Sequence, residues 1–248
     1  MPQHYEKAPI TEAVIDFRIE SGNLIPEQVA DFKEALIGGL GDKYLAPDEM
    51  TEIQMAFERK PDAATSFVQQ ETVVGIRFAS VAGDRVLQAR KNCFTFSHLP
   101  PYTSWDTFKA DAQNAWQAFA KAAAPKKIVR VAIRVINKIE IPTHDVKRYI
   151  NMYPHIESGV IGEFGTFVMQ LQTPLEKLVP NCKSFINVIQ APSEVSSGST
   201  VILDFDLFVD GEFAADSEEV WSLLDKISNA KNTLFESSIT NDTREIIK

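Results

Sequence analysis

The chain opens on a run of alternating apolar and polar residues, which is typical of a strand with one buried face. Over residues 13–20 the apolar side chains occupy every second position, and successive side chains of a strand point to opposite faces of its sheet. Apolar residues then recur at helical spacing near residues 25–38, where Pro26 suits a first helical turn. The end of this helix is predicted at a glycine cluster, Gly38, Gly39 and Gly41.

Three strands and a long amphipathic helix are predicted to complete the first half of the chain. The strand candidates cover residues 52–59, 67–80 and 85–99. The helix is expected to start at Thr103 or Ser104, where the spacing from Thr103 to Asp106 fits a capping box. Pro125 is expected to end it, because the residue before a proline is disfavoured in a helix.

The second half repeats this order of elements. Another alternating strand is predicted over residues 129–141, and a helical segment follows near residues 143–153. Three more strands and a final helix are predicted over residues 165–172, 184–190, 200–209 and 216–237. The order β-α-β-β-β-α therefore occurs twice, which indicates a duplicated unit or a coincidence of common elements.

The predicted fold class is α+β, with an antiparallel-rich sheet and helices on one face. Residues 1–125 and 126–248 would form the two β-α-β-β-β-α halves of one continuous globular unit. Such a duplication resembles the saddle of TATA-binding-protein-like folds and the helix-grip architecture. Folds of this kind host many functions, so the likeness indicates a shape and no activity.

The amino-acid composition limits the kinds of partner that this protein is expected to bind. None of the apolar runs reaches the ~18–20 residues of a membrane span, and the N-terminus has no apolar signal-peptide core. The two cysteines, Cys93 and Cys182, are expected to be reduced in a cytoplasmic protein. The net charge of −9 makes nucleic acid the least expected partner, because neutralising phosphates requires an excess of cations.

Three short blocks carry a resemblance to a known family. They are Tyr-x-x-x-Pro-Ile-x-Glu-Ala at residues 5–13, Arg-x-x-Asn-Lys-Ile-x-Ile-Pro at residues 134–142, and Lys-Asn-x-x-Phe-x-x-x-Ile-Thr at residues 231–240. With these blocks the chain resembles a sporadically distributed bacterial family of similar length that has no assigned activity. It departs from the family pattern at Val135, where an aromatic residue commonly follows the arginine, and at Leu234 and Phe235.

The resemblance implies a genomic context and no catalytic residues. The patchy distribution of the family is similar to that of mobile-element, antitoxin and anti-phage genes. A component of such a locus, binding a protein partner encoded by a neighbouring gene, is therefore one expectation for this chain.

A basic stripe on the strand over residues 129–141 is the sharpest candidate site. Arg130, Arg134 and Lys138 share one face of this strand, and three cations on a sheet face can hold a phosphate, a carboxylate or an acidic partner. The alternative, which we favour, is a solvated face whose cations form salt bridges with acids such as Asp204 and Asp206.

Asn137 interrupts the opposite, apolar face of the same strand. A buried amide must find hydrogen-bond partners, which are either backbone groups, the structural interpretation that we prefer, or a ligand. The carboxylates of Asp204, Asp206 and Asp210 are spaced for a divalent cation, but salt bridges are the simpler interpretation. The chain contains no recognisable catalytic, metal-ligating or cofactor-binding motif.

These observations favour a non-catalytic cytoplasmic binding protein that interacts with a protein partner or with a second copy of itself. No cofactor, metal ion or membrane contact is expected. The alternative is a protein that binds a small anionic ligand or nucleotide through Arg130, Arg134, Lys138 and Asn137.

Overall fold

The computed structural model describes residues 5–20, 29–58, 66–157, 160, 165–194 and 197–248. Its helices and strands, in chain order, are β1 (Ile10–Glu20), α1 (Val29–Leu40), η2 (Gly41–Lys43), β2 (Asp48–Glu58), β3 (Ser66–Ala79), β4 (Arg85–Arg90), β5 (Cys93–His98), α2 (Trp105–Ala123), β6 (Lys127–Ile141), η3 (Val146–Arg148), β7 (Phe167–Pro174), β8 (Cys182–Pro192), β9 (Ser199–Phe213), α3 (Glu218–Ser238) and α4 (Asn241–Ile247), where η marks a short 3-10 turn. Residues 25–28 of the first predicted helix and residue 59 of the next predicted strand lie outside the described residues.

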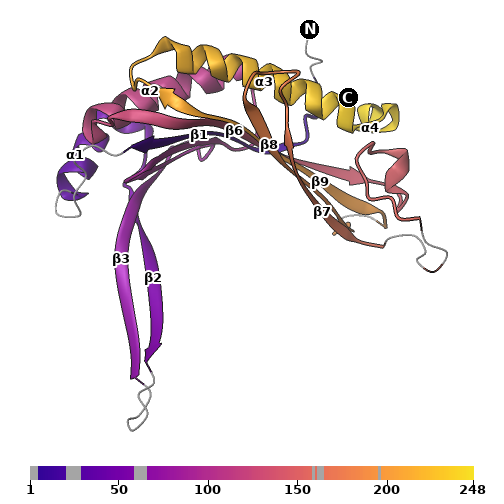
Figure 1. Ribbon diagram of the computed structural model, residues 1–248, viewed down its shortest axis with the longest axis horizontal. Helices are drawn as coiled ribbons and strands as arrows, with labels where there is room; N and C mark the ends of the chain where they lie inside the picture. Colours follow the sequence, from indigo (N-terminus) through magenta and orange to yellow (C-terminus); the bar gives the residue numbers. More distant parts are fainter. Residues whose placement is uncertain (1–4, 21–28, 59–65, 158–159, 161–164, 195–196) are drawn as a thin grey trace.

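The strands form one antiparallel sheet in the order β2-β3-β4-β5-β1-β6-β9-β8-β7. Helices α2 and α3 lie over one face of this sheet, and the outer parts of the sheet bend away from them (Figure 1). The predicted α+β class is therefore confirmed. Because β1 pairs with β6, the sheet continues without a break from the first half of the chain to the second.

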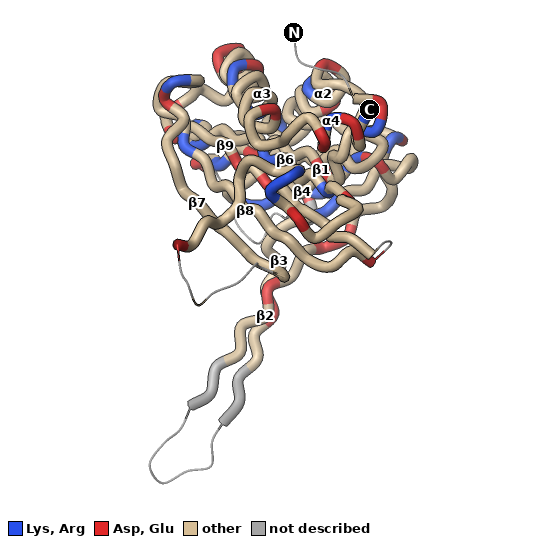
Figure 2. The backbone as a smooth tube through the Cα atoms, turned by 90° about the vertical axis from the view of Figure 1, so that its right-hand side faces the viewer, with Lys and Arg blue, Asp and Glu red and all other residues tan. Residues whose placement is uncertain are grey.

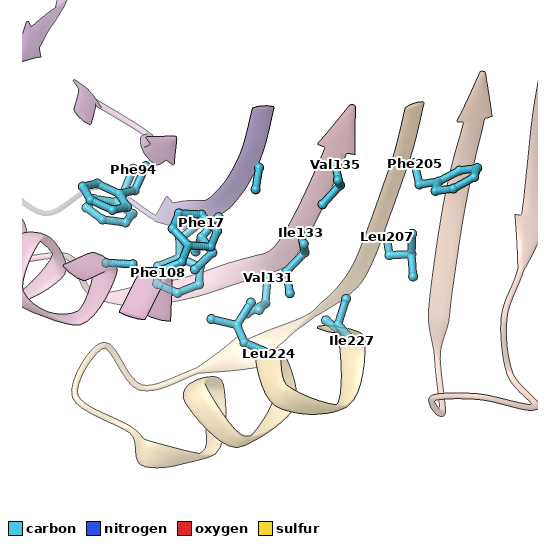
Figure 3. Packing of buried hydrophobic residues seen from close by; sticks show 14 of the residues in the cluster. Phe17, Phe94, Phe108, Val131, Ile133, Val135, Phe205, Leu207, Leu224 and Ile227 are labelled. Atoms are coloured by element: carbon cyan, nitrogen blue, oxygen red, sulfur yellow. The ribbon is translucent and has the colours of Figure 1, made fainter. Parts of the chain in front are cut away.

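The core fills the space between the sheet and the long helices. Phe17 of β1 lies at its centre, fully buried, with its ring 5.0 Å from that of Trp116 in α2 and 5.5 Å from that of Trp221 in α3. Leu224 and Ile227 of α3 cover the apolar side chains of β6 and β9 (Figure 3). The alternation seen in the sequence is thus the division between this covered face and the helix-free face of the sheet.

Strands β2 and β3 form a hairpin arm that extends beyond the body of the sheet (Figures 1 and 2). β3 pairs with β4 only from Gly75 to Ala79, whereas its pairing with β2 begins at Ser66. Among the described strands, the outer part of β3 therefore pairs with β2 alone. Ile53 and Met55 lie two residues apart on β2 and are exposed to 49% and 61%.

The two halves agree in strand order but differ in their helices. Outward from the central pair the order is β1-β5-β4-β3 on one side and β6-β9-β8-β7 on the other. The first half adds β2 and α1, while the helix predicted near residues 143–153 forms only the 3-10 turn η3. The duplication of one unit stays a prediction.

The local signals predicted at the helix ends are confirmed in part. Ser104 is the N-cap of α2, where its hydroxyl accepts a hydrogen bond from the backbone N–H of Thr107, so the predicted box beginning at Thr103 is wrong by one residue. Gly39 lies inside α1, where a Cβ atom would approach the Ala118 Cβ of α2 to 2.8 Å. This glycine permits close helix packing, whereas α1 ends at Leu40, directly before Gly41 with its positive φ of 66°, so the helix end predicted at the glycine cluster is confirmed.

Candidate functional site

The basic stripe lies on the helix-free face of β6, and each of its three cations has an acidic partner. Arg130 donates a hydrogen bond of 2.8 Å to Asp206, and Arg134 binds both carboxylate oxygens of Asp204 at 2.8 Å. Lys138 lies 3.2 Å from Glu140. Lys, Arg, Asp and Glu positions are accordingly intermingled over the body of the protein (Figure 2).

Further groups bind the same acids, so the stripe belongs to a wider polar network. The Arg130 guanidinium also lies 3.4 Å from Asp16 and 4.2 Å from the ring centroid of Phe208. Cys93 donates to Asp16, and burial together with this carboxylate raises the pKa of the Cys93 thiol to about 12. The cations of the stripe thus form the salt bridges that the favoured interpretation expected. Ligand binding by the stripe stays a prediction.

Asn137 lies on the opposite face of β6 from the basic stripe. Its side-chain amide donates a hydrogen bond of 3.1 Å to the Leu203 carbonyl oxygen of the neighbouring strand β9. This bond matches the structural interpretation of the buried amide. Asn137 is therefore separated by the sheet from the other three predicted residues, and it lines a pocket on the helix side.

This pocket has a volume of about 550 Å³, within the range of small-molecule sites. Four parts of the chain surround it: the N-terminal segment 5–10, the loop and helix start at 100–105, the end of the central strands, and the last turns of α3. It lies on the covered face of the sheet, where β6 and β9 meet the ends of both long helices. Sequence reasoning did not predict this pocket.

Lys231 is the most unusual side chain in the pocket. It is only 8% exposed and follows Ile227 by four residues on the buried face of α3. It forms no hydrogen bond or ion pair with any residue in the described part of the chain. Burial without a compensating partner lowers the pKa of the Lys231 ammonium to about 8.

A second polar group of the pocket, Glu236, is already occupied. Tyr5 donates a hydrogen bond of 2.8 Å to one carboxylate oxygen, and Arg244 of α4 lies 3.0 Å from the other. These contacts tie the N-terminal segment to α3 and α4. Burial is the main cause that raises the pKa of Tyr5 to about 12, so this phenol stays neutral in the physiological range.

The wall opposite α3 is the N-terminal end of α2. Thr103, Ser104 and Trp105 line the pocket there, and the backbone N–H groups of a helix start produce a positive potential. His98 holds the loop before α2 in place, since its Nε2 donates a hydrogen bond of 3.2 Å to the carbonyl oxygen of Pro101, which lines the pocket. Burial is the largest cause that lowers the pKa of His98.

All three blocks that suggested a family resemblance contribute to this one pocket. Tyr5 to Ile10 come from the first block, Val135 and Asn137 from the second, and Lys231 to Glu236 from the third. Lys231 also carried a signal that could have been recognised in the sequence. It stands at helical spacing from Ile227 and Leu234, where the apolar stripe predicts a hydrophobic residue.

Comparison with known proteins does not assign the chain to a family. No family model matches the chain, and no curated protein matches it. Among the described residues there is no cluster of three or more His, Cys, Asp and Glu side chains arranged to hold a metal ion. Within the same residues, none of the helices combines the length and apolar character needed to cross a membrane.

Proposed function

We propose that this protein binds a small anionic molecule in the pocket between the N-terminal segment, α2 and α3, with Lys231 as the counter-charge. The observation that carries this proposal is a lysine that is only 8% exposed and whose ammonium has no partner among the described residues, at the wall of a pocket of about 550 Å³. A carboxylate or phosphate oxygen within reach of the Lys231 amine would supply the missing partner.

Two physical arguments support an anion over a neutral ligand. A buried ammonium without a partner destabilises the folded protein, so an anion that pairs with it relieves this cost, whereas a neutral ligand leaves the charge unpaired. The N-terminal end of α2 lines the same pocket and favours negative charge there. Lys231 and this helix end act in the same direction on one bound group.

The proposal keeps one function expected from the sequence and moves it to a different site. Ligand binding was predicted for Arg130, Arg134 and Lys138, whose charges are already satisfied by neighbouring acids. Of the four predicted residues only Asn137 lines the pocket. Lys231 replaces the stripe as the expected anion-binding cation.

A thermal-stability screen with anionic metabolites tests this function. We expect at least one carboxylate or phosphate compound to raise the melting temperature of the protein, since a ligand at 100 times its Kd stabilises by about 2.7 kcal/mol. The gain should disappear in Lys231→Met. It should persist in Lys226→Met, the same substitution at an exposed position of the same helix.

The pH dependence of this gain provides a second readout. Binding should weaken as the pH rises through about 8, where the unliganded Lys231 loses its proton. The other titratable groups around the pocket are Tyr5, Glu6, Lys7, Tyr102 and Glu236. Both tyrosines have pKa values raised to about 12 and stay neutral across this range.

A screen without stabilising anions, or with stabilisation that survives Lys231→Met, would contradict the proposal.

A second candidate function is protein–protein interaction through the β2–β3 arm. Ile53 and Met55 are exposed side chains on one face of this arm, which projects away from the covered core. Exposed apolar side chains that are clustered, and not scattered, favour interaction surfaces. This favours a protein partner or a second copy of the chain as the occupant of the arm.

Sedimentation velocity over a range of concentrations tests the self-association form of this idea. We expect the sedimentation coefficient of the wild type to rise with concentration, and Met55→Asp to suppress the rise because a charge cannot be buried in an apolar contact. Arg134→Ala, on the helix-free face of the sheet, is the control and should sediment as the wild type does. A wild type that remains monomeric throughout would exclude self-association through the arm.

A further inference from the structure

We infer that the ligand at Lys231 is a monocarboxylic acid with an aromatic or branched apolar body, and that nucleotides and other polyanions are excluded. This inference rests on the proposed function and specifies its ligand class. Three features of the pocket carry it: the number of available cations, the composition of the walls, and the hydrogen-bonding groups among the lining residues.

The available positive charge is limited to one buried group. Of the two lysines that line the pocket only Lys231 is buried, while Lys7 lies exposed at the rim beside the oppositely charged Glu6. Glu236 also lines the pocket, and its carboxylate is already bound by Tyr5 and Arg244. A ligand with two or more negative charges would leave at least one of them without a buried counter-ion, which disfavours phosphates of nucleotides.

Aromatic residues from separate segments contribute to the apolar lining of the pocket. Tyr102 and Trp105 come from the loop and first turn of α2, Phe205 from β9, and Phe235 from α3. Trp105 is fixed by a hydrogen bond of 2.8 Å from its indole N–H to Asp225, and Phe235 packs against the ring of Tyr5 at 6.3 Å. Such fixed rings favour an apolar or aromatic ligand body, because they bury it without reorganisation.

Two further polar groups have hydrogen-bonding capacity left for the ligand. Asn137 donates one of its two side-chain N–H groups to the Leu203 carbonyl oxygen, and no described residue accepts from the second, which can donate to a carboxylate. The Tyr102 hydroxyl likewise has no hydrogen-bond partner among them, and burial raises its pKa to about 12, so it can donate to a carboxylate. One ammonium and one phenol suit the two oxygens of a single carboxylate.

A matched set of probes tests the ligand class. The probes are 3-phenylpropionate, its primary amide, acetate, inorganic phosphate and adenosine 5′-triphosphate, each measured by calorimetry and thermal shift against the full chain. We expect 3-phenylpropionate to bind at least tenfold more tightly than its amide, which keeps the shape and loses the charge. Acetate, which lacks the apolar body, should bind at least tenfold more weakly than 3-phenylpropionate.

Variants of the same chain separate the contributions of charge and wall. Lys231→Met should abolish binding of 3-phenylpropionate, whereas Lys226→Met should bind it as the wild type does. Phe235→Leu, which keeps an apolar side chain and removes the ring, should weaken binding of 3-phenylpropionate several-fold.

The possible failures are distinguishable. If phosphate or adenosine 5′-triphosphate stabilises the wild type through Lys231 and 3-phenylpropionate does not, the inference about the ligand class is wrong while the proposed anion site stands. If the amide binds as tightly as the acid and Lys231→Met has no effect on either, the charge of Lys231 is not used. Both the ligand class and the proposed function would then be rejected.

Discussion

Replacing Lys231 with methionine should raise the free energy of unfolding of the ligand-free protein at pH 7 by about 1–3 kcal/mol. Burial lowers the pKa of this ammonium from 10.5 to about 8, and each pKa unit corresponds to about 1.4 kcal/mol. At pH 7 the wild type therefore carries a charge that the folded state disfavours. Methionine has a similar length and suits the buried stripe of α3.

The pH profile of stability identifies the cause of this gain. Between pH 8 and 10.5 the unfolded chain holds a proton on Lys231 that the folded protein has released, so the wild type gains stability as the pH rises through this window. Below pH 8 both states are protonated and the cost is fully present. The difference between Lys231→Met and the wild type should shrink from pH 8 to pH 10.5.

Urea denaturation at several pH values measures both effects. Lys226→Met, exposed on the same helix, should change the free energy of unfolding by no more than about 0.5 kcal/mol at any pH. A loss of stability in Lys231→Met would mean that the ammonium has a partner in the folded protein, contrary to its place in the structure. The same variant is expected to be more stable and unable to bind an anion, a combination that general misfolding cannot produce.

Phe17→Ala should lower the free energy of unfolding by about 3–5 kcal/mol. Phe17 is fully buried, and its ring lies 5.7 Å from Phe94 of β5 in addition to its edge contacts with Trp116 and Trp221. Removing the ring leaves a cavity between β1 and both long helices. The loss should be measured by urea denaturation, with the midpoint shifting and the dependence on urea unchanged.

Phe185→Ala is the matched control for Phe17→Ala. Phe185 lies half-buried on the helix-free face and stacks on Phe208 at 5.5 Å. Its removal takes away less buried surface, so a loss of about 1–2 kcal/mol is expected. Equal losses in the two variants would contradict the central position of Phe17 in the core.

The central strands could be predicted from the sequence because one of their faces is buried. The strand expected over residues 129–141 corresponds to β6, Lys127–Ile141, and the strand expected over 13–20 corresponds to β1, Ile10–Glu20. The predicted run over residues 85–99 is instead two strands, β4 and β5, joined by a tight turn. Alternation alone does not reveal a turn that keeps both strands on the same pattern.

The helix predicted near residues 143–153 shows how tertiary contacts override a local pattern. Val146, Tyr149 and Ile150 have helical spacing and are all buried. One 3-10 turn suffices to bury them, and the following backbone is satisfied by a distant segment. Asn151 donates from its backbone N–H to Ser238, and Thr240 donates from its backbone N–H to Tyr149. These bonds replace those of a longer helix.

The candidate site was predicted in part. Four residues of β6 were predicted to bind a ligand. Of these, Asn137 lines the pocket, whereas the three cations form salt bridges on the other face of the sheet. Alternation assigns these residues to opposite faces, but it cannot tell which face holds a pocket. The sequence does not single out Lys231 as a site residue, because a lysine in a helix is usually solvated.

The sequence by itself determined the antiparallel α+β fold and the buried face of each central strand, since both follow from periodicities of two and 3.6 residues along the chain. Only the tertiary structure decided that residues 5–10, 135–137 and 231–236 meet around one pocket. The same holds for the absence of a counter-ion at Lys231 among the described residues. Periodicity is a property of neighbours in the chain, whereas desolvation and charge pairing depend on neighbours in space.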